Sequence, residues 1–105
     1  MGNMYIAEFD RMPEPGGTVA PMFNAPPVAE QKVTTSASSA SSAAFNASTR
    51  FVRIKLSDAG HLKFGTGSGE AVTATTSSAI HLEAGAYECF AVDGGAKVAV
   101  IDGAA

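Results

Sequence analysis

The sequence is poor in cysteine and in charge. Cys89 is the single cysteine, which excludes an intrachain disulfide. Charged residues make up 16% of the 105-residue chain, whereas an ordinary globular domain has about a quarter. The formal net charge of −3 offers no basic footprint, so we expect no nucleic-acid partner. The remaining surface, made largely of alanine, serine, threonine and glycine, suits contact with other proteins.

Long apolar runs are missing as well. No run approaches the length of a membrane span, and the N-terminus has neither the basic nor the apolar region of a signal peptide. We therefore expect no membrane partner and synthesis in a cytoplasm. A lone thiol on a strand is usually a small buried hydrophobe, so we expect Cys89 to be buried and unreactive.

Proline is absent after residue 27, because all five prolines lie between Pro13 and Pro27. Proline removes a backbone donor and forces extended conformations, which excludes a helix or a central strand in this segment. We predict an extended N-terminal arm at residues 1–30 and a β-sandwich domain at residues 31–105. The arm would lie on its own domain or across a neighbouring subunit. Its candidate partner-binding residues are Met12, Val19, Met22, Phe23 and Val28.

Two segments flank the prolines with weaker signals. Before them, Tyr5, Ala7 and Phe9 alternate with Ile6 and Glu8, so the two sets face opposite ways. After them, residues 31–35 are expected to start a strand. The serine- and alanine-rich residues 36–49 then predict an irregular connection or a weakly specified edge strand.

Residues 50–101 carry the clearest pattern, a period of two that is typical of half-buried strands. We predict six strands here, including one at residues 71–76, and a hairpin around Asp93–Gly95. No window has a helical period. The prediction is therefore an all-β protein, a small sandwich or jelly-roll-like barrel. The inward-facing residues are expected to be Val52, Ile54, Leu56, Leu62, Phe64, Ile80, Leu82, Phe90, Val92, Val98 and Val100.

This core is adequate but thin. Each buried side chain contributes roughly 1.5–3 kcal/mol before chain entropy is subtracted. Association with a partner would add to the apparent stability of such a domain, so we expect a homo-oligomer or a bound partner.

Catalytic patterns are absent from the sequence. The glycine-rich residues 65–70 precede an expected strand, whereas a phosphate-binding loop precedes a helix. No serine lies in a nucleophile elbow with a recognisable base. We therefore predict neither an enzyme nor a cofactor.

The two histidines, His61 and His81, are expected on outward strand faces. With Glu83, Glu88 or Asp58 they would supply metal ligands in principle. Small barrels that bind metal usually carry a His-x-His pair, which is missing here. Exposed or interface histidines are the favoured interpretation.

Basic residues form a further pattern, because Arg50, Arg53, Lys55 and Lys63 are expected to line one face of adjoining strands. This face is either a solvated sheet surface or a patch that docks on an acidic partner. The candidate partner-binding residues of the sheet face are Arg53, Lys55 and Lys63.

The stretch from residue 50 to residue 101 combines alternating strands with small-residue turns, and its distinctive residues are Arg53, His61, Phe64, Gly65, Leu82, Ala84, Gly85, Tyr87, Phe90, Val92, Gly94 and Lys97–Ile101. In these residues the stretch resembles small structural proteins of tailed bacteriophages. The resemblance implies a virion protein, foremost a cement or decoration protein that bridges major capsid subunits on the capsid surface. The alternatives are a neck, tail or receptor-binding component of the virion, or a cupin-like small-molecule or metal-binding protein.

Overall fold

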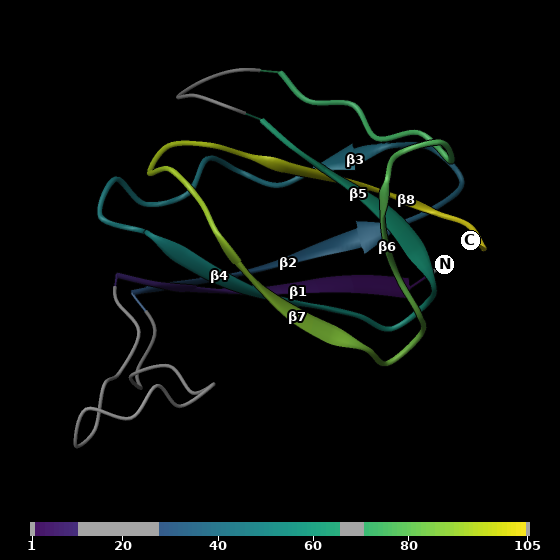
Figure 1. Cartoon of the computed structure of the whole chain (residues 1–105), viewed down its shortest axis with the longest axis horizontal. Helices are drawn as coiled ribbons and strands as arrows, with labels where there is room; N and C mark the ends of the chain where they lie inside the picture. The colour runs from purple at the N-terminus through teal and green to yellow at the C-terminus, as the bar shows by residue number, and fades with distance from the viewer. Residues whose placement is uncertain (1, 11–27, 66–70, 105) are drawn as a thin grey trace.

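The computed structural model describes residues 2–10, 28–65 and 71–104. Within these ranges all regular elements are β-strands, in two antiparallel four-stranded sheets (Figure 1). Sheet A has the order β2-β1-β4-β7 and sheet B the order β3-β8-β5-β6. The strands are β1 (Gly2–Phe9), β2 (Ala29–Thr35), β3 (Ala40–Ser41), β4 (Phe51–Leu56), β5 (Gly60–Phe64), β6 (Ile80–Leu82), β7 (Tyr87–Ala91) and β8 (Val98–Asp102). The all-β prediction is confirmed, and two such sheets are consistent with a sandwich.

The strand pairs are nested along the chain. The β5–β6 pair is innermost, β4 pairs with β7 outside it, and β3 pairs with β8 outside that. Strand β1 then lies between β2 and β4 and is hydrogen-bonded to both. Apart from β1–β2 and β5–β6, consecutive strands lie in different sheets.

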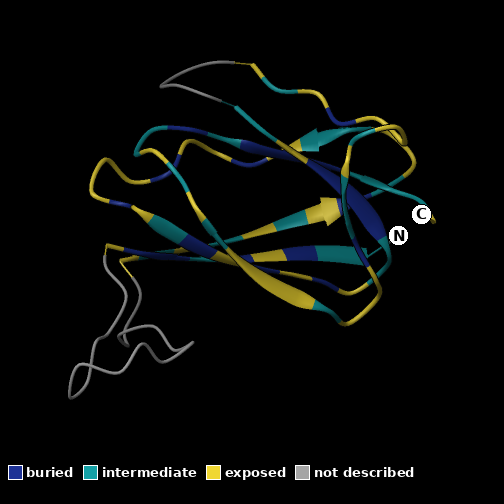
Figure 2. Ribbon diagram, in the orientation of Figure 1, coloured by how far each residue is buried: buried dark blue, intermediate teal, exposed yellow. Residues whose placement is uncertain are grey.

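The predicted alternation produces the core. All eleven residues expected to face inward are buried in the central cluster or pack against it. In β4, Val52, Ile54 and Leu56 are fully buried, and Figure 2 shows buried segments alternating with exposed ones along the strands. The same cluster also contains Met4, Ile6, Phe45 and Ala96. Phe45 belongs to the serine- and alanine-rich connection, so this connection contributes to the core.

The position of β1 corrects the domain boundary. Residues 1–30 were expected to form an arm, but Gly2–Phe9 is an inner strand of sheet A. The alternation along β1 places Met4 and Ile6 in the core. Burial of these apolar side chains favours a strand within the sheet over an extended arm. The proline-rich part of the expected arm falls within residues 11–27, which lie outside the described residues. The predicted edge strand is β3, at the margin of sheet B.

Two further predictions are wrong. Residues 71–76 form no strand. The Ala74 N–H donates to the Ser39 hydroxyl (2.9 Å) and not to a backbone carbonyl of a neighbouring strand. The Asp93–Gly95 turn forms no hairpin, because it joins β7 in sheet A to β8 in sheet B. Gly95 has a φ of 83°, in the left-handed region that favours glycine, and its N–H donates to the Phe45 carbonyl (3.0 Å).

A buried carboxylate connects the first strand to the rest of the sandwich. Glu8 is only 1% exposed. Its Oε1 atom accepts hydrogen bonds from the Asn46 N–H (2.7 Å) and the Thr49 hydroxyl (2.8 Å). Its Oε2 atom accepts one from Nε2 of Gln31 (3.0 Å). The carboxylate therefore joins β1, β2 and the connection between β3 and β4.

Gln31 extends this network. Its Oε1 atom accepts from the Ala43 N–H (2.9 Å), and its Nε2 also lies 3.2 Å from the Ala43 carbonyl. Two residues further on, the Phe45 N–H donates to the Ala96 carbonyl (2.8 Å) near the start of β8. The Glu8 network thus fixes the segment that carries Phe45 into the core.

Replacing Glu8 tests this network. Glu8→Ala leaves buried donors unpaired and is expected to lower the free energy of unfolding by about 3 kcal/mol. Glu8→Gln keeps one carbonyl acceptor but sets an amide NH₂ against that of Gln31, so a smaller loss of about 1 kcal/mol is expected. The measurement is urea unfolding.

The matched control is Glu83→Gln, because the Glu83 side chain is 77% exposed. This change is expected to stay within about 0.5 kcal/mol of the parent. Equal stability of Glu8→Ala and the parent would contradict a structural role for the network.

Candidate functional site

The outer faces of the two sheets differ in what covers them. The outer face of sheet B carries Ala99 and His61, which are 0% and 5% exposed. Residues 71–79 lie against this face: Ala74 is bound to Ser39, and the Ser78 carbonyl lies 2.9 Å from Nδ1 of His61. In Figure 1 this green segment runs alongside sheet B, on the side away from sheet A.

The outer face of sheet A carries exposed side chains. Tyr5 is 43% exposed and Tyr87 is 65% exposed, and these are the only two tyrosines of the chain. We call this surface the basic-aromatic face. Its residues are Tyr5, Ala7, Glu30, Lys32, Arg53, Lys55, Tyr87 and Cys89.

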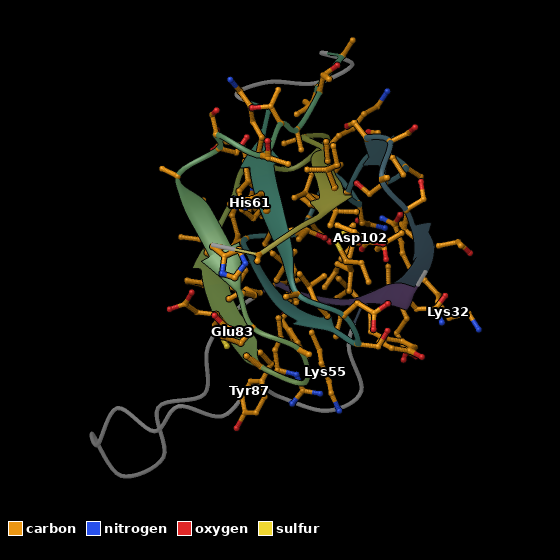
Figure 3. The ribbon with its side chains drawn as sticks, turned by 90° about the vertical axis from the view of Figure 1, so that its right-hand side faces the viewer. Lys32, Lys55, His61, Glu83, Tyr87 and Asp102 are labelled. Atoms are coloured by element: carbon orange, nitrogen blue, oxygen red, sulfur yellow. The ribbon has the colours of Figure 1, made fainter. Side chains whose placement is uncertain are left out.

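Strand register arranges this face in rows. Tyr5 pairs with Lys32 on one side and with Lys55 on the other, and Lys55 pairs with Tyr87. The row Lys32–Tyr5–Lys55–Tyr87 therefore crosses all four strands. Figure 3 shows Lys55 and Tyr87 pointing outward from the same side of the sandwich. A groove of about 600 Å³ lies over this surface, lined by Tyr5 and Lys55 among others.

The charge on the basic-aromatic face is mainly positive. Lys32, Arg53 and Lys55 are opposed there by Glu30 alone. Within residues 2–10, 28–65 and 71–104, neither lysine makes an ion pair. The Arg53 guanidinium lies 5.6 Å from the centre of the Tyr87 ring, at cation–π distance. These cations therefore remain available to an anionic partner.

The structure separates the predicted basic residues. Arg53 and Lys55 lie together on β4, but Lys63 lies on β5, on the outer face of the other sheet. Their predicted common face is wrong, because the turn between β4 and β5 carries the chain from one sheet to the other. Arg50 instead donates from Nη1 to the Ala47 and Thr49 carbonyls (3.1 and 3.0 Å).

Of the residues of this face, sequence reasoning assigned Arg53 and Lys55 to partner binding and missed, among others, Tyr5, Lys32 and Tyr87. Each lies at an outward position of a strand segment, so the period-two pattern was the available signal. What the pattern could not supply was the neighbour of each strand in the sheet.

Of the predicted arm residues, the structure describes one. The Val28 N–H donates to the Glu8 carbonyl (2.8 Å), just before β2, and its side chain is 39% exposed. Met12, Val19, Met22 and Phe23 lie outside the described residues. Their role in binding a partner stays a prediction.

The histidines form a second cluster. Their ring centres lie 4.7 Å apart in an edge-to-face arrangement. His61 is buried, so its expected exposure is wrong, and its Nε2 lies 3.1 Å from the Ala104 carbonyl. The Nε2 of His81 lies 2.9 Å from the Gly103 carbonyl. The pair therefore holds the chain that follows β8.

The residues considered as metal ligands in principle do not converge. His81 Nδ1 lies 3.7 Å from the Glu83 carboxylate, whereas Glu88 lies on β7 of the other sheet. In the part of the chain that the structure describes, no three His, Cys, Asp or Glu side chains are grouped to hold a metal ion. Asp102 ends β8, and its Oδ1 is buried without a hydrogen-bond partner among these residues.

Cys89 is exposed on β7, contrary to the expectation of a buried thiol. β7 is an edge strand, and Cys89 points outward opposite Arg53. Desolvation raises the pKa of the Cys89 thiol above its ordinary value, the Arg53 charge opposes this rise, and the Glu88 charge adds to it.

Comparisons with known protein families, with curated proteins and with solved structures find no match to this chain. The described segments contain no helix with the length and apolarity needed to cross a membrane.

Thiol labelling tests the placement of Cys89. The folded protein is expected to react with a soluble disulfide reagent without denaturant, because the side chain is exposed. The reactive species is the thiolate, and the thiol pKa is raised, so the labelling rate should still be rising at a pH where that of a free cysteine levels off. Labelling only after unfolding would contradict the exposed position.

Proposed function

We propose that this chain is a bacteriophage virion structural protein, a capsid cement or decoration protein that stabilises the head by bridging major capsid subunits. The basic-aromatic face is its docking surface, and the capsid surface is its site of action. The single observation that carries the proposal is the cationic outer face of sheet A, on which Tyr5 and Tyr87 are exposed.

The topology supports a jelly-roll assignment. The nested pairs β5–β6, β4–β7 and β3–β8 form a long antiparallel ribbon folded over itself, with β1 and β2 pairing at its open end. Jelly rolls are eight-stranded double sheets that occur in viral capsid proteins, and also in lectins and cupins. Since a fold hosts many functions, the proposal depends on the face and on the resemblance of residues 50–101, with the fold in support.

The asymmetry between the sheets favours docking through one side. Residues 71–79 lie against the outer face of sheet B, whereas sheet A presents exposed tyrosines and lysines that make no ion pair among the described residues. Charges on such a face set the orientation and rate of docking more than the affinity. Bridging through this face requires either that the face straddles two capsid subunits or that the protein forms a homo-oligomer.

Truncation of the N-terminal segment cannot test this proposal. Deleting residues 1–30 would remove β1, an inner strand of sheet A that buries Met4 and Ile6. Loss of binding would then report unfolding. Substitutions at exposed residues of the basic-aromatic face avoid this problem.

The test compares two charge-reversed variants in rebinding to phage heads that lack this protein. The variant Lys32→Glu/Arg53→Glu/Lys55→Glu reverses the face and is expected to reduce occupancy on the order of tenfold or more, with a strong dependence on salt. The control Lys63→Glu changes an exposed cation of the opposite sheet and is expected to bind as the parent does. Occupancy is measured by co-sedimentation.

Equal binding of the triple variant and the parent would refute docking through this face. Imaging of the particle separates the virion alternatives, because icosahedral cement requires on the order of hundreds of copies and a neck or tail part about a dozen or fewer. Absence of the protein from purified particles would refute a virion role.

A further inference from the structure

We propose that the basic-aromatic face binds an extended acidic segment of a partner protein, in the polyproline II conformation, with carboxylates three residues apart. The segment lies along the row Lys32–Tyr5–Lys55–Tyr87, across the strands. This inference rests on the proposed function only in using the same docking face.

The spacing of the two lysines defines the repeat of the partner. Lys32 on β2 and Lys55 on β4 flank Tyr5 on β1, so they are two strands apart. Neighbouring strands lie about 4.8 Å apart, which separates the two backbone positions by roughly 10 Å. A polyproline II helix rises about 3.1 Å per residue with three residues per turn, so every third side chain points the same way at roughly 9 Å intervals. A Glu-x-x-Glu pattern therefore matches the two ammonium groups.

The aromatic residues favour the same conformation. Proline-rich segments dock in aromatic-lined grooves because their backbone is already extended and loses little entropy on binding. Tyr5 stands between the two lysines at the edge of a groove of about 600 Å³. Tyr87 continues the row beyond Lys55 and is the most exposed large hydrophobic side chain of the described residues, at 65%. Tyr5 is positioned to contact the residues between the two carboxylates, and Tyr87 those that follow the second carboxylate.

The charge balance selects an acidic partner. Three cations face one carboxylate on this surface, and neither lysine has an ion-pair partner among the described residues. Single-stranded nucleic acid also combines negative charge with stacking on aromatic rings. Nucleic-acid binding domains are usually strongly basic, whereas this chain has a pI near 5.2, so an acidic protein segment is favoured.

Three synthetic peptides of equal length test the proposal on the full chain. The first repeats Glu-Pro-Pro three times, the second has the same composition with its glutamates in one block, and the third replaces glutamate by glutamine. Binding is followed by amide chemical shifts at low and moderate salt. The first peptide is expected to shift the amides of Tyr5, Lys32, Lys55 and Tyr87 and to bind more tightly than the other two.

A matched pair of double variants tests which lysines bind the glutamates of the peptide. Lys32→Gln/Lys55→Gln is expected to weaken binding of the first peptide about tenfold, since two exposed ion pairs are lost. Lys63→Gln/Lys97→Gln removes the same charge elsewhere and is expected to leave the affinity unchanged. The shift pattern also shows whether each variant remains folded.

Equal affinity for the spaced and blocked glutamate peptides would overturn the polyproline II geometry. Tighter binding of oligothymidylate than of the first peptide at the same salt would overturn the choice of partner. Capsid rebinding that depends on the face, combined with no peptide binding, would refute this inference and leave the proposed function standing. Peptide binding without capsid rebinding would refute the proposed function and leave this inference standing.

Discussion

The sandwich depends on the carboxylate of Glu8. A buried carboxylate is stable only where donors surround it, and this one receives them from Gln31, Asn46 and Thr49. These contacts fix the connection between β3 and β4, which is irregular over most of its length. That connection carries Phe45 into the core and bonds to Ala96 beside β8. The Glu8 carboxylate of sheet A therefore positions the connection between β3 in sheet B and β4 in sheet A.

The basic-aromatic face follows from the same arrangement. Alternation along β1 sends Met4, Ile6 and Glu8 inward, so Tyr5 and Ala7 face solvent. Register then places Lys32 and Lys55 on either side of Tyr5. The cationic surface is thus formed by residues distant in sequence, although the chain as a whole is acidic. Its local charge is opposite in sign to the net charge, which is why composition gave no indication of it.

Local sequence correctly predicted the strands that form the core, but not which strands lie next to each other in a sheet. Period two placed Val52, Ile54 and Leu56 correctly, because that signal resides within one strand. The common face of Arg53 and Lys63 was wrong, because sheet membership depends on long-range pairing. Residues 71–76 are rich in β-branched side chains, yet strand propensity depends on an available partner. The site escaped prediction for the same reason, since Tyr5, Lys32 and Tyr87 meet only through register.

The irregular segment at residues 71–79 has a consequence for the exposure of sheet B. By covering Ala99 and His61, it leaves sheet A as the sheet whose outer face carries the exposed Tyr5 and Tyr87. Surface segments of this kind tolerate changes of length at modest cost in free energy. A shorter segment here would uncover a second sheet face, opposite the basic-aromatic face. The exposure of the outer face of sheet B therefore depends on a stretch that contributes no strand to either sheet.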